Sequence, residues 1–296
     1  MDCTFGRVIT AMVTPFNKFG EVDYTAVSQL VMHLINNGSD GIVVAGTTGE
    51  SPTLSKEEKL RLFRRVKEVA GEKISVIANV GNNNTLESVA FAKQVEEETN
   101  VDGLLVVNPY YNKPNQKGLY EHFKTIAEAT QLPIMLYNIP GRTSVNLEAH
   151  TTIRLSSISN IVAIKESSGN LDQMATIIEG TDDSFKLYSG DDNLTLPVIS
   201  IGGYGVVSVA SHFVGKEIQR MIKQKDAAIH RRLLPFFQAL FIDTNPIVSK
   251  HLLNGLGYNV GGTRLPLTTL SQADKIHVQT VYDDTQKKLK ELPINY

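Results

Sequence analysis

The chain has 296 residues, of which 42% are hydrophobic and 20% are charged, with a formal net charge of −2. This composition is ordinary for a globular protein with a large core. Basic side chains are scattered among acidic ones rather than gathered in a stripe, which argues against a nucleic-acid partner. The sequence contains no secretory-leader pattern and no apolar run long enough to span a bilayer, so we expect a cytoplasmic protein without a membrane partner.

Cysteine and histidine usage argues against disulfides and metal. The single cysteine, Cys3, excludes an internal disulfide framework, and we interpret it as a small packed residue near the first strand. The seven histidines include no HExxH pair. Without such a pair or a cluster of thiolates, neither a structural nor a catalytic zinc site is expected.

Short apolar runs rich in valine and isoleucine recur along the chain. They do not alternate apolar with polar residues, so the pattern predicts strands that are covered on both faces. The runs are 7–13, 41–46, 74–80, 103–109, 133–138, 161–165, 185–190 and 205–210.

Helical periodicity and capping signals lie between these runs. Ser55 followed by Glu58 predicts the start of one helix, and Gly71 predicts its end. Thr85 opens a second predicted helix, and a third covers 117–130. A strand and a helix repeated about eight times are typical of a (β/α)8 TIM barrel.

An open doubly wound sheet is the main rival to the barrel. It normally has fewer units, and no GxGxxG motif follows the first strand, which disfavours it. Beyond about residue 225 the strand pattern stops and only helical segments follow. We therefore predict a barrel domain over 1–224 and a small helical appendage over 225–296 that packs on the barrel.

In a TIM barrel, functional side chains stand at the carboxyl ends of the strands. Lys165 ends an apolar run, and strand alternation places Glu166 on the opposite face, so Glu166 cannot be its direct partner. Burial of a lysine disfavours the charged form, and a neutral amine attacks carbonyl groups to form a Schiff base. The alternative is a lysine that extends from the strand end into solvent.

Other side chains at the strand ends have both functional and ordinary interpretations. Tyr137 could shuttle protons during imine formation, or it could be a packed aromatic residue. The hydroxyls of Thr47 and Thr48 suit a carboxylate, although such turns also occur in plain connections. Arg142 could bind a carboxylate with its planar fork, or it could be solvated.

Five fragments stand at the predicted strand ends, in the order GTTGESPTL, PYYNKPNQKGLYEHF, LYNIPGRT, IVAIKESSGN and LYSGDD. Together they resemble the dihydrodipicolinate synthase family, now called 4-hydroxy-tetrahydrodipicolinate synthases, of the pyruvate-dependent class I aldolase or N-acetylneuraminate lyase superfamily. The resemblance covers essentially the whole chain. It implies a lyase that condenses pyruvate with L-aspartate 4-semialdehyde on the diaminopimelate route to lysine, with no cofactor and with pyruvate bound covalently.

The resemblance implies a role for each matching residue. Lys165 matches the lysine that forms the Schiff base, and Tyr137, Thr47 and Tyr111 match a proton relay. Tyr111 would come from the neighbouring subunit of a homo-oligomer, either a dimer or a tetramer. The residues that match the pyruvate-binding part of the site are Thr48, Val207 and Gly190. Arg142 matches the residue that binds the semialdehyde carboxylate. Gly141 departs from the serine that many members have, without affecting this assignment.

Some family members are inhibited by lysine, and their effector site matches Ser51, Pro52, Lys56, Lys59, Asn83, Glu87 and Tyr110. Here Lys56 and Lys59 would oppose a cationic effector, since like charges about 6 Å apart at an effective dielectric of about 20 repel by roughly 3 kcal/mol before screening. We therefore predict weak or absent feedback inhibition. The alternative is that both lysines point into solvent.

Two other functions remain open at this point. A sister aldolase, such as an N-acetylneuraminate lyase or a 2-keto-3-deoxy-sugar-acid lyase, would use the same lysine and tyrosine. A catalytically silent barrel that senses a keto acid is the alternative from another class. Arg142 and the tyrosine pair favour the semialdehyde, and the intact set of Lys165, Tyr137 and Thr47 argues against a sensor.

Overall fold

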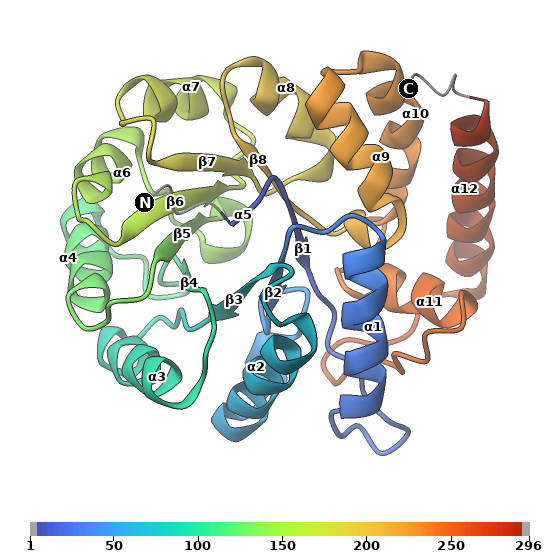
Figure 1. Ribbon diagram of the computed structural model, residues 1–296, viewed down its shortest axis with the longest axis horizontal. Coiled ribbons are helices and arrows are strands. Elements are labelled where there is room, and N and C mark those ends of the chain that lie inside the picture. The colour runs from blue at the N-terminus through green and yellow to red at the C-terminus, as the bar shows by residue number, and fades with distance from the viewer. Residues whose placement is uncertain (1–4, 292–296) are drawn as a thin grey trace.

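The computed structural model describes residues 5–291, so Cys3 lies outside the described residues. Eight parallel strands close into a barrel in sequence order, from β1 next to β2 around to β8 next to β1 (Figure 1). The predicted TIM barrel is therefore confirmed. The strands β1 to β8 are Val8–Ala11, Gly41–Val44, Ser75–Asn79, Gly103–Val107, Ile134–Asn138, Ile161–Glu166, Lys186–Ser189 and Gly205–Ser208.

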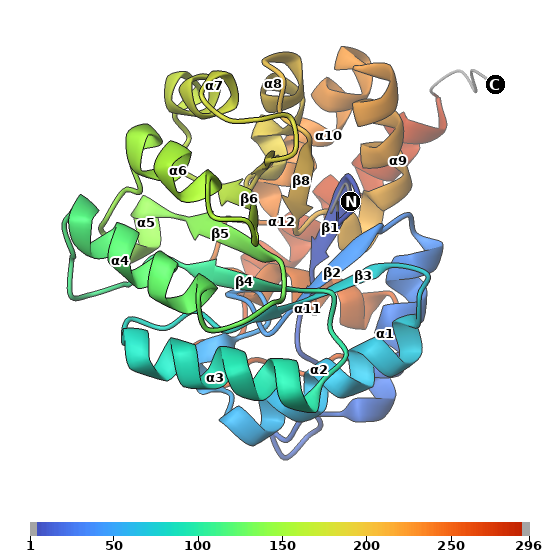
Figure 2. The ribbon, with the colours of Figure 1, turned by 60° about the vertical axis from the view of Figure 1, so that its left-hand side comes forward.

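Helices surround the strands, as the two views of the ribbon show (Figures 1 and 2). The sequence pattern had indicated only part of this helical layer. The α-helices α1 to α12 are Tyr24–Asn36, Lys56–Ala70, Thr85–Glu98, Gln116–Ala127, Pro140–Thr143, Ala149–Ser156, Leu171–Glu179, Thr195–Ser200, Ser211–Gln224, Ala227–Ala239, Ile247–Gly255 and Gln272–Lys290, with 3-10 turns η1 at Ser51–Thr53 and η2 at Asp192–Leu194. No helix in the described part of the chain is long and apolar enough to cross a membrane.

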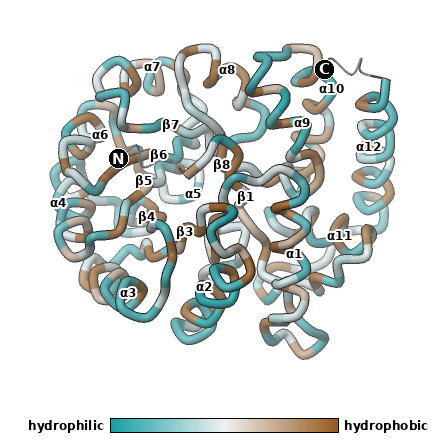
Figure 3. The backbone as a smooth tube through the Cα atoms, in the orientation of Figure 1, coloured by the Kyte–Doolittle hydropathy of each residue, from teal (hydrophilic) through white to brown (hydrophobic). Residues whose placement is uncertain are grey.

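Local sequence explains where several elements begin and end. Ser55 and Glu58 form the predicted capping box at the start of α2, and Gly71 caps its end. At α3 the capping residue is Asn84, one position before the predicted Thr85, because the Asn84 side chain accepts a hydrogen bond from Leu86 N. The strands are buried on both faces, and hydrophobic residues concentrate there while α12 is mostly hydrophilic (Figure 3).

The C-terminal helices pack against the barrel, as predicted. Phe213 of α9, Phe236 of α10 and Tyr282 of α12 form a cluster with ring centroids 5.5 to 5.9 Å apart. The Tyr258 hydroxyl lies 2.6 Å from Nδ1 of His33 in α1. The division at residues 224 and 225 falls between α9 and α10 and remains a prediction.

Candidate active site

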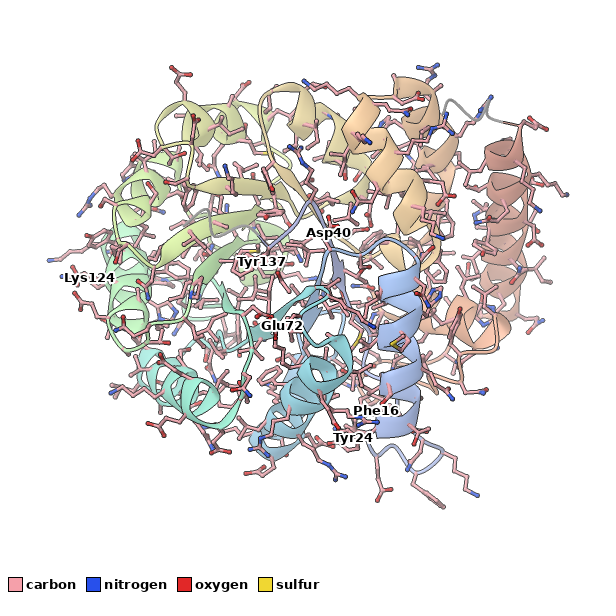
Figure 4. All side chains as sticks on the ribbon, in the orientation of Figure 1. Phe16, Tyr24, Asp40, Glu72, Lys124 and Tyr137 are labelled. Atoms are coloured by element: carbon pink, nitrogen blue, oxygen red, sulfur yellow. The ribbon has the colours of Figure 1, made fainter. Side chains whose placement is uncertain are left out.

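Lys165 and Tyr137 lie side by side at the carboxyl ends of β6 and β5. The two residues are paired in the strand register, and each side chain is almost fully buried, with 6% of Lys165 and 4% of Tyr137 exposed. Lys165 Nζ lies 4.1 Å from the centroid of the Tyr137 ring, a cation–π contact. Figure 4 shows Tyr137 among the strands near the middle of the molecule. Lys165 is therefore held inside the barrel end rather than extended into solvent.

Glu166 occupies the opposite face of β6, as strand alternation predicts. Its carboxylate accepts hydrogen bonds from Asn138 Nδ2 at 3.0 and 3.1 Å, from Gln173 Nε2 at 3.1 Å and from Ser168 N at 2.7 Å. Burial raises the pKa of Glu166, and these hydrogen bonds act in the opposite direction. Glu166 thus anchors the ends of β5 and β6 and leaves Lys165 without a carboxylate from its own strand.

Gly190, directly after β7, leaves room for the lysine. A Cβ atom at this position would lie 1.8 Å from Ser167 Oγ and 3.1 Å from Lys165 Cε. Any larger residue would therefore displace the side chains around the amine. The lack of a side chain at Gly190 therefore lets Ser167 Oγ and Lys165 Cε pack against the backbone at this position.

Asp191 is a charged neighbour of Lys165 that was absent from the predicted site. Burial raises the pKa of Asp191 to about 6, while the positive charge of Lys165 opposes that shift. The next residue, Asp192, is fully buried and accepts hydrogen bonds from Val209 N and Ala210 N at 3.1 and 2.9 Å. The signal that could have found Asp191 was its position, because LYSGDD places a carboxylate directly after a strand end.

Thr48, in the loop after β2, and Val207, in β8, are both buried. Val207 belongs to β8 and pairs with Ile9 of β1. Thr48 is 4% exposed, and its hydroxyl accepts a hydrogen bond from Asn245 Nδ2 at 2.8 Å. Asn245 lies between α10 and α11, outside the predicted barrel domain, and the sequence pattern did not identify it.

One cavity of about 460 Å³ joins predicted catalytic and effector positions. Its lining includes Thr47, Tyr137 and Arg142 of the predicted active site. It also includes residues predicted for the effector site, namely Ser51, Pro52, Lys56, Lys59 and Tyr110.

The charge of this cavity is positive. Lys59 is partly buried, whereas Lys56 is exposed, so the solvated alternative holds for Lys56 and not for Lys59. Burial lowers the pKa of Lys59, and the charge of Lys56 lowers it further. Asn83 and Glu87 are not among the lining residues, whereas Asn82 is. Glu87 accepts hydrogen bonds from the Asn82 and Asn84 amides instead.

Tyr111 stands apart from this cavity. It follows β4, its side chain is 89% exposed and its φ of 75° is in the left-handed region. The adjacent loop is fixed by hydrogen bonds from Asn83 Nδ2 to Tyr110 O at 3.1 Å and from Asn112 Nδ2 to Asn83 O at 2.8 Å. The Tyr111 side chain is therefore exposed and is not part of the cavity lining.

Comparison with known proteins decides the family. Residues 4–284 match the model of the dihydrodipicolinate synthetase family. The chain belongs to this family. A relative from Halalkalibacterium halodurans, 4-hydroxy-tetrahydrodipicolinate synthase 1, is 55% identical over 91% of this chain and 94% of its own length.

Solved structures of family members agree with this assignment. A dihydrodipicolinate synthase from Cyanidioschyzon merolae with lysine bound is 51% identical, with a TM-score of 0.93 over 95% of this chain and 98% of that one. One from Bacillus anthracis is 45% identical, with a TM-score of 0.92 over 98% and 99% of the two chains. The predicted family is therefore confirmed.

The family fragments come together at one end of the barrel. GTTGESPTL supplies Thr47 and Thr48 after β2, LYNIPGRT supplies Tyr137 and Arg142, and IVAIKESSGN supplies Lys165. Gly141, the departure from the common family pattern, has no atom within 4 Å of an added Cβ, so serine or glycine fits there. No group of three or more histidine, cysteine or acidic side chains in residues 5–291 is arranged to hold a metal ion.

Proposed function

We propose that the protein is a 4-hydroxy-tetrahydrodipicolinate synthase, which condenses pyruvate with L-aspartate 4-semialdehyde in the diaminopimelate route to lysine. The observation that carries this proposal is the buried Lys165 amine in contact with the Tyr137 ring at the end of the barrel. A lysine held in such a site can form a Schiff base with a keto acid.

The reaction follows from the chemistry of the imine. The Lys165 amine adds to the C2 carbonyl of pyruvate, and loss of water gives a protonated imine. A methyl proton is then removed, and the enamine carbon attacks the aldehyde carbon of the second substrate. The amine of that substrate finally displaces Lys165 by transimination and closes the ring. The imine accepts the electron pair during proton removal, so no cofactor is required.

Protons must move at several of these steps, and we assign their transfer to Tyr137. Its ring touches Lys165, and Tyr137 also lines the cavity together with Thr47. We assign Thr48 and Val207 to pyruvate binding beside Gly190. We assign Arg142 to the carboxylate of the semialdehyde because its guanidinium lines the cavity and has no ion-pair partner among the described residues.

Self-association completes the site in this proposal. A left-handed φ at a bulky residue costs of the order of 1–3 kcal/mol, and surrounding contacts normally compensate for it. Tyr111 has such a φ yet is exposed in the single chain. Insertion of Tyr111 into the cavity of a second subunit would bury the ring and add its hydroxyl to Tyr137 and Thr47. A dimer is the smallest assembly that allows this.

Reductive trapping tests the proposed chemistry. Incubation with pyruvate and borohydride should add one reduced pyruvyl group to the peptide that contains Lys165. An unmodified Lys165 peptide would contradict the proposal.

Substrate comparison separates the alternatives that share the lysine. Turnover should be far higher with pyruvate and aspartate semialdehyde than with N-acetylneuraminate or 2-keto-3-deoxy sugar acids. Preference for a sugar acid would identify a sister aldolase. Pyruvate binding without turnover of any aldehyde would identify a sensor.

A further inference from the structure

Thr48 receives a hydrogen bond from a residue 197 positions further along the chain. Asn245 Nδ2 lies 2.8 Å from Thr48 Oγ1, and only 6% of Asn245 and 4% of Thr48 are exposed. A bond between two neutral side chains at this depth is shielded from water and fixes the orientation of both groups.

The direction of this hydrogen bond determines what the Thr48 hydroxyl can do. A hydroxyl group has one proton to donate and lone pairs that accept. Since the Asn245 amide donates to Thr48, the Thr48 proton remains available. Among residues 5–291, the Thr48 hydroxyl donates no hydrogen bond, and the bond from Asn245 is its one side-chain contact of this kind. The hydroxyl can therefore donate a hydrogen bond to a group that enters the site.

The segment that carries Asn245 also holds the loop around Thr48. Lys250 Nζ in α11 lies 2.7 Å from Glu50 Oε1, and both side chains are buried. Further along, Arg264 N donates to Glu50 Oε2 at 2.9 Å. The C-terminal segment thus contacts the loop after β2 at two positions, Thr48 and Glu50, and restricts its movement.

We propose that Asn245 is a positioning residue for the substrate carboxylate, acting through Thr48. Its amide fixes the Thr48 hydroxyl as a hydrogen-bond donor toward the carboxylate of the keto acid. This inference rests on the proposed function, in which Thr48 binds the pyruvate carboxylate. It assigns a role in the active site to the C-terminal helical segment, which then contributes more than packing.

Two variants at position 245 test the direction of the bond. Asn245→Ala removes the donor and should raise the KM for pyruvate roughly tenfold, the effect of losing one well-placed hydrogen bond, while kcat changes less than about twofold. Asn245→Asp places an ionised acceptor beside Thr48 at high pH. The Thr48 proton would then turn toward Asp, so the KM should rise further.

The pH dependence of Asn245→Asp is a signature that loosened packing would not produce. As the pH falls and the introduced carboxyl becomes protonated, it can donate to Thr48 as the amide does. The ratio of its pyruvate KM to that of the wild type should therefore decrease between pH 8.5 and 6. A ratio that is constant, or a KM equal to that of the wild type at pH 8.5, would overturn the proposal.

A control in the same segment separates positioning from stability. Asn254 in α11 bonds to the Gly261 backbone and is exposed, so Asn254→Ala loosens the segment without touching Thr48. Its pyruvate KM should stay at the wild-type value.

In a Thr48→Val background, Asn245→Ala should have no further effect on KM. Equal KM increases in the Asn245→Ala and Asn254→Ala variants, or additive effects with Thr48→Val, would contradict the inference.

The same measurements distinguish this inference from the proposed function. Absence of a trapped adduct on Lys165 in the wild type would contradict the function itself. A wild-type adduct with an unchanged half-saturating pyruvate concentration in both Asn245 variants would contradict only the role of Asn245.

Discussion

Lys165 Nζ lies 4.1 Å from the centroid of the Tyr137 ring, and the two residues are paired across β5 and β6. The aromatic face therefore fixes the position of the amine, while the phenol hydroxyl stands at the edge of the same ring. Packing and proton transfer can be separated experimentally because phenylalanine retains the ring and removes only the hydroxyl.

The Tyr137→Phe variant should keep its fold and still form the Schiff base, but slowly. Loss of a positioned proton donor typically reduces kcat by about 10²–10⁴-fold. Steady-state kinetics and the rate of borohydride trapping measure the two effects. Lys165→Arg is the matched control, and it should give no adduct because a guanidinium group remains protonated. A Tyr137→Phe enzyme with wild-type kcat would exclude the phenol from proton transfer.

Asp191 should make pyruvate binding depend on pH near 6. Above its pKa of about 6, the ionised carboxyl stabilises positive charge at Lys165 and at the protonated imine. Below that pH the half-saturating pyruvate concentration for trapping should rise. The Asp191→Asn variant should resemble the acidic form at every pH. If wild type and variant share one pH profile, Asp191 has no such role.

Thermal unfolding provides a second measurement at Asp191. Its folded-state pKa of about 6 exceeds the ordinary value of 3.8, so ionisation reduces folding stability as the pH rises through this window. Asp191→Asn should therefore unfold at a higher temperature than the wild type at pH 8, and the difference should shrink toward pH 4.

Subunit exchange should reveal whether Tyr111 acts across an interface. Tyr111→Phe and Lys165→Ala enzymes should each be nearly inactive. In a mixed dimer, one site can contain both an intact Lys165 and an intact partner tyrosine, so mixing should restore up to about half of the activity per heterodimer. Hybrids as inactive as both parents would argue against donation between subunits. Sedimentation velocity should report at least a dimer.

Lysine should inhibit this enzyme weakly. Lys56 and Lys59 line one cavity, where burial lowers the pKa of Lys59 and the charge of Lys56 lowers it further. A third cation would bind there at an added electrostatic cost. Replacing both by histidine should strengthen lysine inhibition several-fold at pH 8, where histidine is neutral. Lys73→His, at an exposed position outside the lining, should have no effect. Submillimolar half-inhibition of the wild type would show that the charge argument fails.

Removing one partner of the buried ion pair between Glu50 and Lys250 should reduce folding stability more than replacing both partners together. Burial lowers the pKa of Lys250 to about 8, and the charge of Glu50 opposes this shift. Glu50→Gln or Lys250→Met alone leaves one buried charge unpaired, at a cost of about 3–5 kcal/mol. The double variant should recover much of the lost unfolding temperature. A double variant with fully additive losses would contradict this account.

Much of the barrel could be predicted from the sequence because its determinants are local. Unbroken apolar runs require cover on both faces, and the capping residues Ser55 and Gly71 mark the limits of α2. Alternation along β6 was enough to separate Lys165 from Glu166. Helices α1 and α7 were not predicted individually, although both are more amphipathic than α3, which was predicted.

The tertiary structure decided the contacts between segments that are far apart in the chain. The proximity of Asp191 to Lys165 depends on how β6 and β7 pair, and the Asn245 bond to Thr48 depends on where the C-terminal segment packs. The burial of Lys59 beside Lys56 likewise depends on the walls of the cavity around them. Sequence by itself determined the repeating strands and helices, the lysine at a strand end and the family. Each of these depends on short runs of residues that are adjacent in the chain. Burial, pKa and hydrogen-bond direction were decided only by folding, because they depend on groups that other parts of the chain bring within a few ångströms.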